Sequence, residues 1–385
     1  MKDFLFKMPT KIFFGENKAL KIGEIISELG MKKVFVVTDK FLVTTDCVKN
    51  LVSKLENEKF EVTVFTEIVP EPPIDVVDKA ADALKARDSD VVIAVGGGST
   101  IDISKAICML KNNEGSVKEY LFGGTRKVKN ASLPLIAVPT TAGSGSEVTA
   151  ASVISDEENN IKLSVTDEKI IPNIAVVDPV MQKGMPPLIT ASTGMDALTH
   201  AIEAYVSKNA SIITDMYAET AIKLIGKNIY KATFDPDDIE GRENMAIAST
   251  LAATAFANGG LGAVHGISQA LGGVSHIAHG IANSMFLPLV MEKNMVGNLE
   301  KFSKIAKLLG EDIEGLSLRD AAEKSVERVK VMAKDLNIPS KLSEFNVTEE
   351  VFDEVVKGTM DYRLLPLNPV KINEKDVYDI LEKAM

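Results

Sequence analysis

Hydrophobic positions in the first half of the chain follow two alternating spacings. Short β-branched and apolar runs such as VVIAVGGGS predict buried strands, while the segments between them repeat apolar residues every three or four positions, which predicts helices. The predicted strands span 32–39, 61–68, 91–99, 133–141 and 174–179, and the predicted helices 41–58, 74–90 and 101–113. Strands that alternate with helices form a parallel sheet covered on both faces, so we predict an α/β domain. Residues 152–165 have a polar turn between two apolar arms, which predicts a hairpin appended to the sheet.

From about residue 188 onward the spacing is helical, with no convincing strand. The predicted helices span 188–207, 211–233, 239–271, 279–296, 298–309, 317–336, 348–359 and 373–384. Pro186 and Pro187 suit a linker or a helix start. We therefore predict an α/β domain over residues 1–186 and an all-helical domain over residues 187–385.

Charge and composition narrow the classes of function. The 385 residues include 43 Lys and Arg against 54 Asp and Glu, a formal net charge of −11, whereas a nucleic-acid-binding face is basic. No segment approaches the ~18 uninterrupted apolar residues of a membrane helix, and the first residues lack the apolar core of a signal peptide. Two isolated cysteines, Cys47 and Cys108, make neither a disulfide framework nor a zinc site. These features favour a globular protein of the reducing cytoplasm without nucleic-acid or membrane partners.

Two glycine- and hydroxyl-rich turns follow predicted strands. Residues 96–99 (GGGS) open a helix, where free backbone N–H groups can bind an anion, and residues 139–147 (PTTAGSGSE) offer hydroxyls for phosphate or ribose oxygens. Asp39 ends an earlier strand, where a carboxylate can accept from a ribose hydroxyl. Each feature alone fits a tight turn or a solvated cap, and GGGS is not the GxGxxG fingerprint. Together, at the carboxyl ends of strands in one sheet, they favour a ligand site.

One carboxylate and the histidines have the spacing of a metal site. Asp196 and His200 are four residues apart on one predicted helix face, and the other histidines lie between residues 265 and 279. A set of Asp196, His200, His265 and one further imidazole suits Fe(II), Zn(II) or a similar ion. The alternative is a surface Asp with histidines buried in the core. His276 and His279 are three residues apart, so spacing does not choose between them.

These segments together resemble the iron-containing (group III metal-dependent) alcohol dehydrogenase family over essentially the whole chain. The matching blocks are VVTDKFL, AVGGGSTIDISKA, PTTAGSGSEVT, VVDP, TGMDALTHAIEAY, GGLGAVHGISQALGG and AHGIANSMFLP. The resemblance implies an N-terminal NAD-binding α/β domain, a C-terminal helical metal-binding domain, and an active site in the cleft. Dehydroquinate synthase is similar in architecture but carries different motifs.

The resemblance also implies roles for individual residues. The implied metal ligands, which are also the catalytic set, are Asp196, His200, His265 and His279. The implied cofactor contacts are Asp39, Gly97, Gly98, Ser99, Asp102, Thr140, Thr141, Ser144 and Lys162. An acid at position 39 goes with NAD because it would repel the extra phosphate of NADP. The implied cofactors are therefore NAD and one divalent metal, with Fe(II) ahead of Zn(II).

The chain departs from the family pattern at three positions. Gln269 stands where many members have a second histidine near the nicotinamide and the substrate, and glutamine cannot shuttle a proton. The proton relay then uses water or ribose hydroxyls, or His276 substitutes. Glu71 stands where members often have Asn, and Val370 where many have Arg.

The expected reaction is hydride transfer between nicotinamide and a short primary alcohol or diol and its aldehyde, with the metal polarising the substrate oxygen. By resemblance the pocket is lined by Phe256, Gln269, Ala151 and the segment 361–369, which contains Arg363. A pocket arginine would favour an anionic aldehyde such as sulfoacetaldehyde or succinate semialdehyde, because guanidinium binds an acid group bidentately. If Arg363 lies on the surface instead, the alternative is a neutral substrate such as 1,3-propanediol, lactaldehyde or butanol.

Two other classes compete with a dehydrogenase: a non-redox, dehydroquinate synthase-like enzyme and a non-catalytic NAD-binding protein. The intact set of four metal ligands argues against the second. The family resemblance also implies a homodimer or a larger homo-oligomer, and the apolar strand KIFFG (11–15) would suit sheet pairing between subunits.

Overall fold

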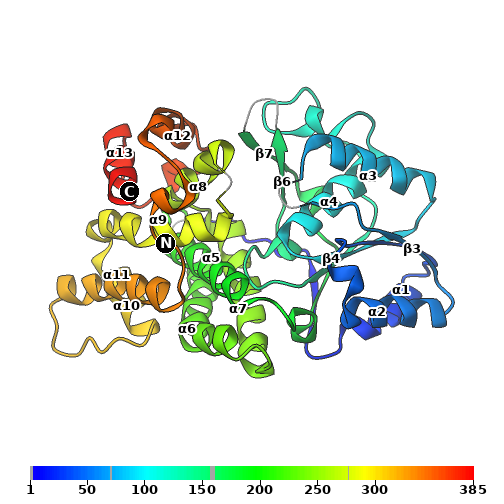
Figure 1. Ribbon diagram of the computed structural model, residues 1–385, viewed down its shortest axis with the longest axis horizontal. Helices are drawn as coiled ribbons and strands as arrows, with labels where there is room; N and C mark the ends of the chain where they lie inside the picture. The colour runs from blue at the N-terminus through cyan, green and yellow to red at the C-terminus, as the bar shows by residue number, and fades with distance from the viewer. Residues whose placement is uncertain (1–2, 70–71, 157–160, 276) are drawn as a thin grey trace. The chain divides into compact units, whose positions relative to one another are not determined.

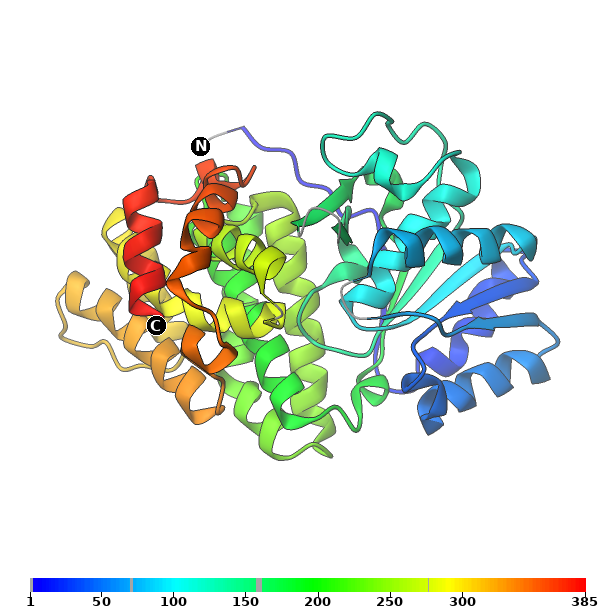
Figure 2. The same cartoon turned by 45° about the horizontal axis from the view of Figure 1, so that its top comes forward.

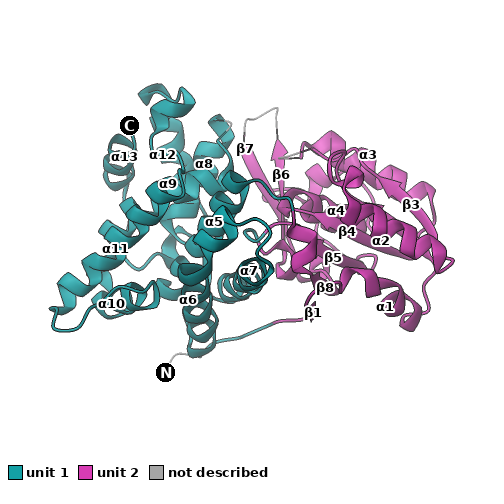
Figure 3. Ribbon diagram, turned by 60° about the horizontal axis from the view of Figure 1, so that its bottom comes forward, with its two compact units in different colours: residues 1–7, 142–144, 184–385 teal, residues 8–141, 145–183 magenta. Residues whose placement is uncertain are grey.

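The computed structural model describes residues 3–69, 72–156, 161–275 and 277–385. They form two compact units, which Figure 3 colours separately. The sheet unit contains residues 8–141 and 145–183; the helical unit contains residues 184–385, residues 142–144 and the described residues up to Lys7. An α/β class for the first half and an all-helical class for the second are thereby confirmed, while a domain boundary at residue 186 stays a prediction.

The sheet unit is built on a parallel sheet in the order β1-β8-β5-β4-β2-β3. In that order the strands are Lys11–Phe14, Ile174–Val177, Leu135–Pro139, Val91–Gly96, Lys33–Val37 and Glu61–Phe65. The two central strands, β4 and β5, are buried along their whole length, which explains their continuous apolar sequences. Register places Gly96 opposite Pro139, so both glycine- and hydroxyl-rich turns leave the sheet at the same edge.

Helices cover both faces of this sheet (Figures 1 and 2). They are α1 (Ile22–Glu28), α2 (Asp46–Asn57), α3 (Ile74–Ala86) and α4 (Gly98–Asn112). Val34 and Val36 of β2 pack in the core with α1 and α2, whereas Phe35 and Val37 pack in the core with α3 and α4. This alternation follows from the two-residue period of a strand.

A two-stranded antiparallel hairpin, β6 (Ala151–Asp156) with β7 (Ile161–Thr166), is attached to this unit. It confirms the predicted hairpin, although its turn, residues 157–160, lies outside the described residues. The hairpin is held to α4 by hydrogen bonds: the Lys105 amino group donates to the Ala151 carbonyl at 2.7 Å, and the Val153 N–H donates to the Asp102 carboxylate at 2.9 Å.

The helical unit packs around one large core. Its helices are α5 (Pro187–Val206), α6 (Ile212–Phe234), α7 (Ile239–Gly259), α8 (Ala263–Val274), α9 (His279–Asn294), α10 (Leu299–Leu308), α11 (Leu318–Asp335), α12 (Phe352–Met360) and α13 (Glu374–Lys383). From Thr190 onward nearly every residue of α5 is buried, so this helix lies inside the unit. Its polar residues are therefore buried too, and each needs a partner.

Short 3-10 turns complete the two units. They are Ala19–Lys21, Leu42–Thr44, Val117–Tyr120, Ser146–Val148, Glu168–Ile170, Pro179–Gln182, Met295–Gly297, Leu342–Phe345, Glu349–Val351 and Leu365–Leu367.

Two elements differ from the sequence-based prediction. The helix predicted over 239–271 is two helices, because Gly260 has a left-handed backbone (φ 82°) and ends α7, and α8 leaves at an angle of 99°. No single helix in the described part of the chain is long and apolar enough to cross a membrane; only α7 and α8 taken together reach that length and hydropathy. Helix α1 was not predicted, and the strand KIFF, which was expected to pair between subunits, is β1. KIFF pairs in parallel with β8 of its own sheet, and β1 is an edge strand.

Candidate active site

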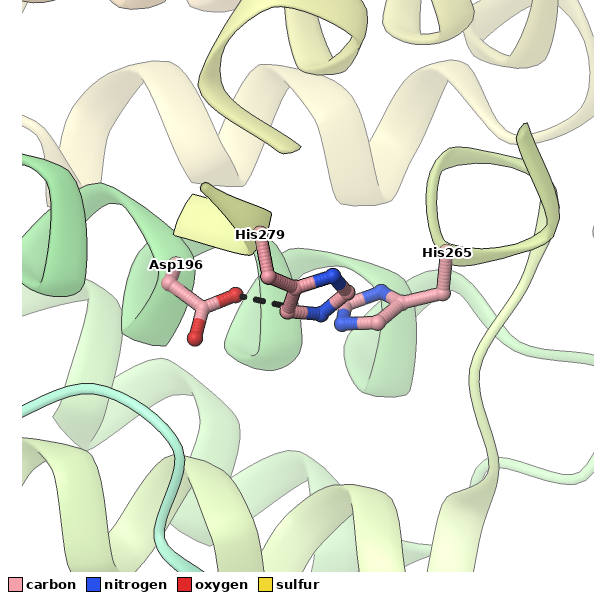
Figure 4. Close-up of side chains that lie close together, drawn as sticks. All are labelled: Asp196, His265 and His279. Carbon is pink, nitrogen blue, oxygen red and sulfur yellow. Dashed lines mark ion pairs between the residues drawn. The ribbon is translucent and has the colours of Figure 1, made fainter. Parts of the chain in front are cut away.

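Four potential metal donors converge inside the helical unit. Asp196 and His200 lie one turn apart on α5, His265 lies in the first turn of α8, and His279 begins α9. Figure 4 shows Asp196, His265 and His279 pointing toward one another, and one ligand atom from each lies within 4.8 Å of the others. The His200 Nε2 is 4.0 Å and the His279 Nε2 3.9 Å from the Asp196 Oδ1. The structure thus brings together all four predicted ligands.

Two neighbours fix which nitrogen of a histidine faces the centre. The Nδ1 of His265 is 2.6 Å from a carboxylate oxygen of Glu203, and the Nδ1 of His200 is 3.3 Å from the Gly143 carbonyl. Because carboxylate and carbonyl oxygens only accept, each Nδ1 carries the proton, and each Nε2 keeps its lone pair for a metal. Glu203 is 4% exposed, so this contact is shielded from water.

The turn before α8 holds His265 in place. The second carboxylate oxygen of Glu203 accepts from the Val264 N–H at 2.7 Å, and the Asn368 side-chain oxygen accepts from the Ala263 N–H at 3.2 Å. Both bonds satisfy free N–H groups of the first turn of α8. A Cβ on Gly262 would lie 2.7 Å from the Asn368 Oδ1, so only glycine lets the two caps approach.

The protonation states of the α5 donors also suit metal binding. Burial lowers the pKa of His200 to about 4, although Asp196 and the Gly143 carbonyl act in the opposite direction. Burial alone would raise the pKa of Asp196, but the three histidines and a hydrogen bond from Asn283 outweigh it, so its pKa lies below the usual value. A neutral imidazole and a carboxylate anion are the forms that bind a divalent cation.

One asparagine, Asn283 on α9, also reaches this centre. It is fully buried, and its Nδ2 donates to the Asp196 Oδ1 at 2.6 Å. One carboxylate with three imidazoles, of which two have their Nε2 lone pairs fixed, fits a divalent ion. Sequence reasoning missed both Glu203 and Asn283. The available signal was spacing: Glu203 lies three residues after His200, and Asn283 lies four after His279 on one helix face.

The second predicted site lies at the carboxyl edge of the parallel sheet. Gly97 precedes α4 in an extended conformation, and no side chain caps this helix, so its first N–H groups are available to a phosphate. The Thr140 N–H donates to the Gly96 carbonyl at 3.0 Å, and a Cβ on Gly97 would lie 3.4 Å from the Thr141 side chain. The structure therefore brings Gly97, Gly98, Ser99, Thr140 and Thr141 together, at neighbouring strand ends.

Asp39 follows β2, the strand beside β4, and is half-buried. Its Oδ1 accepts from the Phe41 and Leu42 N–H groups at 2.8 Å each. These bonds fix the carboxylate at the strand end and leave Oδ2 available to a ribose hydroxyl.

The other predicted cofactor residues have different surroundings. Asp102 accepts from the Ser146 hydroxyl, from Lys105 at 3.4 Å and from the Val153 N–H at 2.9 Å, so both of its oxygens have partners within the sheet unit. Lys162 lies on β7. Ser144 is assigned to the helical unit, whereas the two threonines of its motif are assigned to the sheet unit. Contact of these three residues with the cofactor stays a prediction.

The predicted substrate residues divide between the two units. Phe256 stacks on His200 with ring centroids 4.4 Å apart, and Gln269 follows His265 by one helical turn and is half-buried. Ala151 belongs to the sheet unit, where its carbonyl accepts from Lys105. The Arg363 side chain is exposed. His276 and Glu71 lie outside the described residues.

A helix start with available N–H groups at the edge of a parallel sheet, and four potential metal donors in a helical unit, fit the class of metal-dependent dehydrogenases that use a dinucleotide. Comparison with known proteins gives the family. Residues 9–179 match the domain family described as "Iron-containing alcohol dehydrogenase". Residues 190–385 match the domain family described as "Fe-containing alcohol dehydrogenase family, C-terminal". The chain therefore belongs to the iron-containing alcohol dehydrogenase family, whose members use NAD(H) and a divalent metal.

Similar proteins match over the full length. The chain is 38% identical to the NAD-dependent methanol dehydrogenase of Bacillus methanolicus over 380 residues, 99% of each chain. It is 38% identical to the 1,3-propanediol dehydrogenase of Klebsiella pneumoniae over 386 residues, covering 100% of this chain and 99% of that one. A crystal structure of a 1,3-propanediol oxidoreductase superposes with a TM-score of 0.96 at 37% identity, covering 100% of both chains. The predicted family and the predicted enzyme class are confirmed.

Proposed function

We propose that this enzyme interconverts a short, uncharged primary alcohol or diol and its aldehyde. NAD(H) carries the hydride, and one divalent metal is held by Asp196, His200, His265 and His279. The observation that carries the proposal is the grouping of Asp196, His265 and His279, with the His200 Nε2 4.0 Å from the Asp196 Oδ1; the outer nitrogens of His200 and His265 hold the ring protons. A divalent cation bound there supplies a Lewis acid for the substrate oxygen.

The chain's own groups do the rest. Asp196 contributes one negative charge to the centre, and Glu203 holds His265 with its Nε2 inward. The N-terminus of α4 would bind the pyrophosphate of NAD, and the Asp39 Oδ2 would accept from the adenosine ribose. Against NADP, the same carboxylate would face the extra phosphate, which favours NAD.

Proton movement needs a path other than position 269. The Gln269 side chain is half-buried on α8 and can contact the substrate as a neutral donor or acceptor. It cannot exchange a proton near neutral pH. We therefore assign the relay to water or ribose hydroxyls, with His276 as the alternative. A Gln269→His variant with an altered pH–rate profile would support control of proton transfer at this position, and an unchanged profile would refute it.

An uncharged substrate fits the surroundings of the donors better than an anion. The described neighbours that affect the pKa of Asp196 and His200 include no lysine or arginine, and Phe256 presents an apolar ring against His200. Arg363, the residue that would favour an acid group, is exposed. The matching methanol and 1,3-propanediol dehydrogenases are named for neutral substrates.

The test is NADH oxidation by protein loaded with Fe(II) under anaerobic conditions, or with Zn(II), against paired aldehydes. Acetaldehyde, propionaldehyde and lactaldehyde represent the neutral class; sulfoacetaldehyde and succinate semialdehyde represent the anionic class. We expect the neutral aldehydes to have the higher kcat/KM. Arg363→Ala should then change both classes equally, as should the control Arg319→Ala on another exposed arginine of the helical unit. A selective loss of activity on anions in Arg363→Ala would refute the uncharged pocket.

The same assay separates the rival classes. Metal-loaded protein that binds NADH but turns over no aldehyde would favour a non-redox enzyme or an NAD-binding sensor over a dehydrogenase. Loss of NADH oxidation when the metal is removed by a chelator, and its return on adding metal, is the outcome expected for the metal-dependent reaction.

A further inference from the structure

The Asn283 carboxamide lies where the metal donors converge. Its Nδ2 is 2.6 Å from the Asp196 Oδ1, 3.1 Å from the His265 Nε2 and 3.0 Å from the His279 Nε2. The side chain has no exposed surface. A single N–H₂ group is therefore within hydrogen-bond reach of three of the four atoms assigned to the cation.

The chemistry of these acceptors explains why a donor is needed there. Glu203 keeps the proton of His265 on Nδ1, so the inner Nε2 only accepts, and the neighbouring carboxylate oxygen of Asp196 accepts as well. Buried lone pairs that face one another without a donor are costly. The Nδ2 carries two hydrogens, and it presents no free lone pair that would repel these acceptors. It therefore takes the place of a positive charge without carrying one.

The oxygen of the same amide is in an unfavourable environment. The Asn283 Oδ1 is buried and has no hydrogen-bond partner among the described residues. An unsatisfied buried oxygen is tolerated only where the orientation gains more elsewhere. Here the gain is at Nδ2, because turning the amide over would point its oxygen at the carboxylate and the imidazole lone pairs.

We propose that Asn283 is a placeholder for the metal: in the metal-free protein its amide holds Asp196, His265 and His279 in position, and the incoming cation displaces it. The metal site is thereby preorganised, and metal binding competes with an internal hydrogen-bond donor. Asn283 is a positioning residue in this scheme. The proposal concerns metal uptake, so it rests on the metal site and not on the proposed substrate.

The scheme predicts that the affinity for the metal increases when the Asn283 side chain is truncated. Asn283→Ala destabilises the metal-free form, which loses the donor, more than the metal-loaded form, in which the amide has already been displaced. Zn(II) should therefore bind about tenfold more tightly to Asn283→Ala than to the wild type, the equivalent of one hydrogen bond to a charged group. Asn283→Ser, which keeps one donor, should lie between the two.

The experiment is a Zn(II) titration of chelator-treated protein against a chromophoric competitor, without NAD or alcohol, together with the Tm of each variant with and without Zn(II). Ser284→Ala is the matched control: it removes a buried polar group at the next position of α9, whose hydroxyl donates to the Gly280 carbonyl at 2.6 Å. It should leave the Zn(II) affinity unchanged.

We expect the Tm of Asn283→Ala to fall mainly in the metal-free form. Unchanged or weaker Zn(II) binding by both Asn283 variants, or an equal fall of Tm in both forms, would overturn the placeholder and leave an ordinary packing role. A wild-type protein that binds no Zn(II) and no Fe(II) would instead refute the metal centre itself. The two failures are therefore distinguishable.

Discussion

The contact between Glu203 and His265 gives the sharpest test of how the chain prepares the metal centre. In Glu203→Gln the shape of the side chain is kept, but one of its two acceptor oxygens becomes an N–H₂ group. In the native protein these oxygens accept from the His265 Nδ1 at 2.6 Å and from the Val264 N–H at 2.7 Å. Glutamine cannot accept both bonds with separate oxygens.

Either orientation of the new amide disturbs the centre. If its oxygen keeps the Val264 bond, its N–H₂ faces the His265 Nδ1, which must then accept; the imidazole proton moves to Nε2 and blocks that atom as a ligand. If its oxygen faces His265 instead, two donors meet at Val264 in a buried position. The structure thus predicts that Glu203→Gln lowers the affinity for the metal, and not merely the stability of the fold.

The expected magnitude is about 10–100-fold weaker metal binding, the usual effect of removing a partner of a ligating histidine, or about 1.4–2.8 kcal/mol. The assay is a Zn(II) titration by competition, with circular dichroism to confirm that the helices remain. Glu219→Gln is the control, because it makes the same change in the same unit, at a side chain that pairs with Tyr205 and Lys304. Zn(II) affinity within about twofold of the wild type in Glu203→Gln would refute the tautomer argument.

Three further predictions follow from the same geometry. Burial lowers the pKa of His200 to about 4, below its unfolded value of about 6.5, so the unfolded chain binds the extra proton as the pH falls. Through this group the free energy of unfolding of the metal-free protein should fall by about 2 kcal/mol from about pH 7 to about pH 5. In urea titrations, His200→Asn should remove this part of the pH dependence of stability. Asp39→Gly should raise kcat/KM with NADPH about tenfold by removing charge repulsion; no change with NADPH would contradict the role of Asp39. Lys105 is fully buried and donates to Ser146 at 2.6 Å, so Lys105→Met should lower the free energy of unfolding by about 3–5 kcal/mol, whereas the exposed control Lys85→Met should have almost no effect; a Lys105→Met variant as stable as the control would argue against this network.

Local pattern predicted the elements whose formation depends on nearby residues. The continuous apolar strands of residues 91–96 and 135–139 and the amphipathic helix of residues 74–86 follow from periodicity, and the structure confirms them. The apolar strand at Lys11–Phe14 was expected, but its pairing with Ile174–Val177 of the same chain was not, because sequence spacing does not show which strands of a sheet become neighbours. The break between α7 and α8 was missed because apolar spacing continues across it, while the backbone turns at Gly260.

The sequence by itself determined the class of this protein: its alternating and helical periods, its glycine turns after strands, and its carboxylate and histidines at helical spacing. These signals are local, since each depends on residues within one or two helical turns. Only the tertiary structure decided which nitrogen of His265 faces the centre and which donor holds the ligands together. Those choices depend on Glu203, 62 positions away from His265, and on Asn283, 87 positions away from Asp196. The inner nitrogen of His265 keeps its lone pair only when Glu203 holds the ring proton on the other nitrogen, and the ligand atoms share a donor only when Asn283 reaches them. These residues are far apart in the sequence, and only folding brings them into contact.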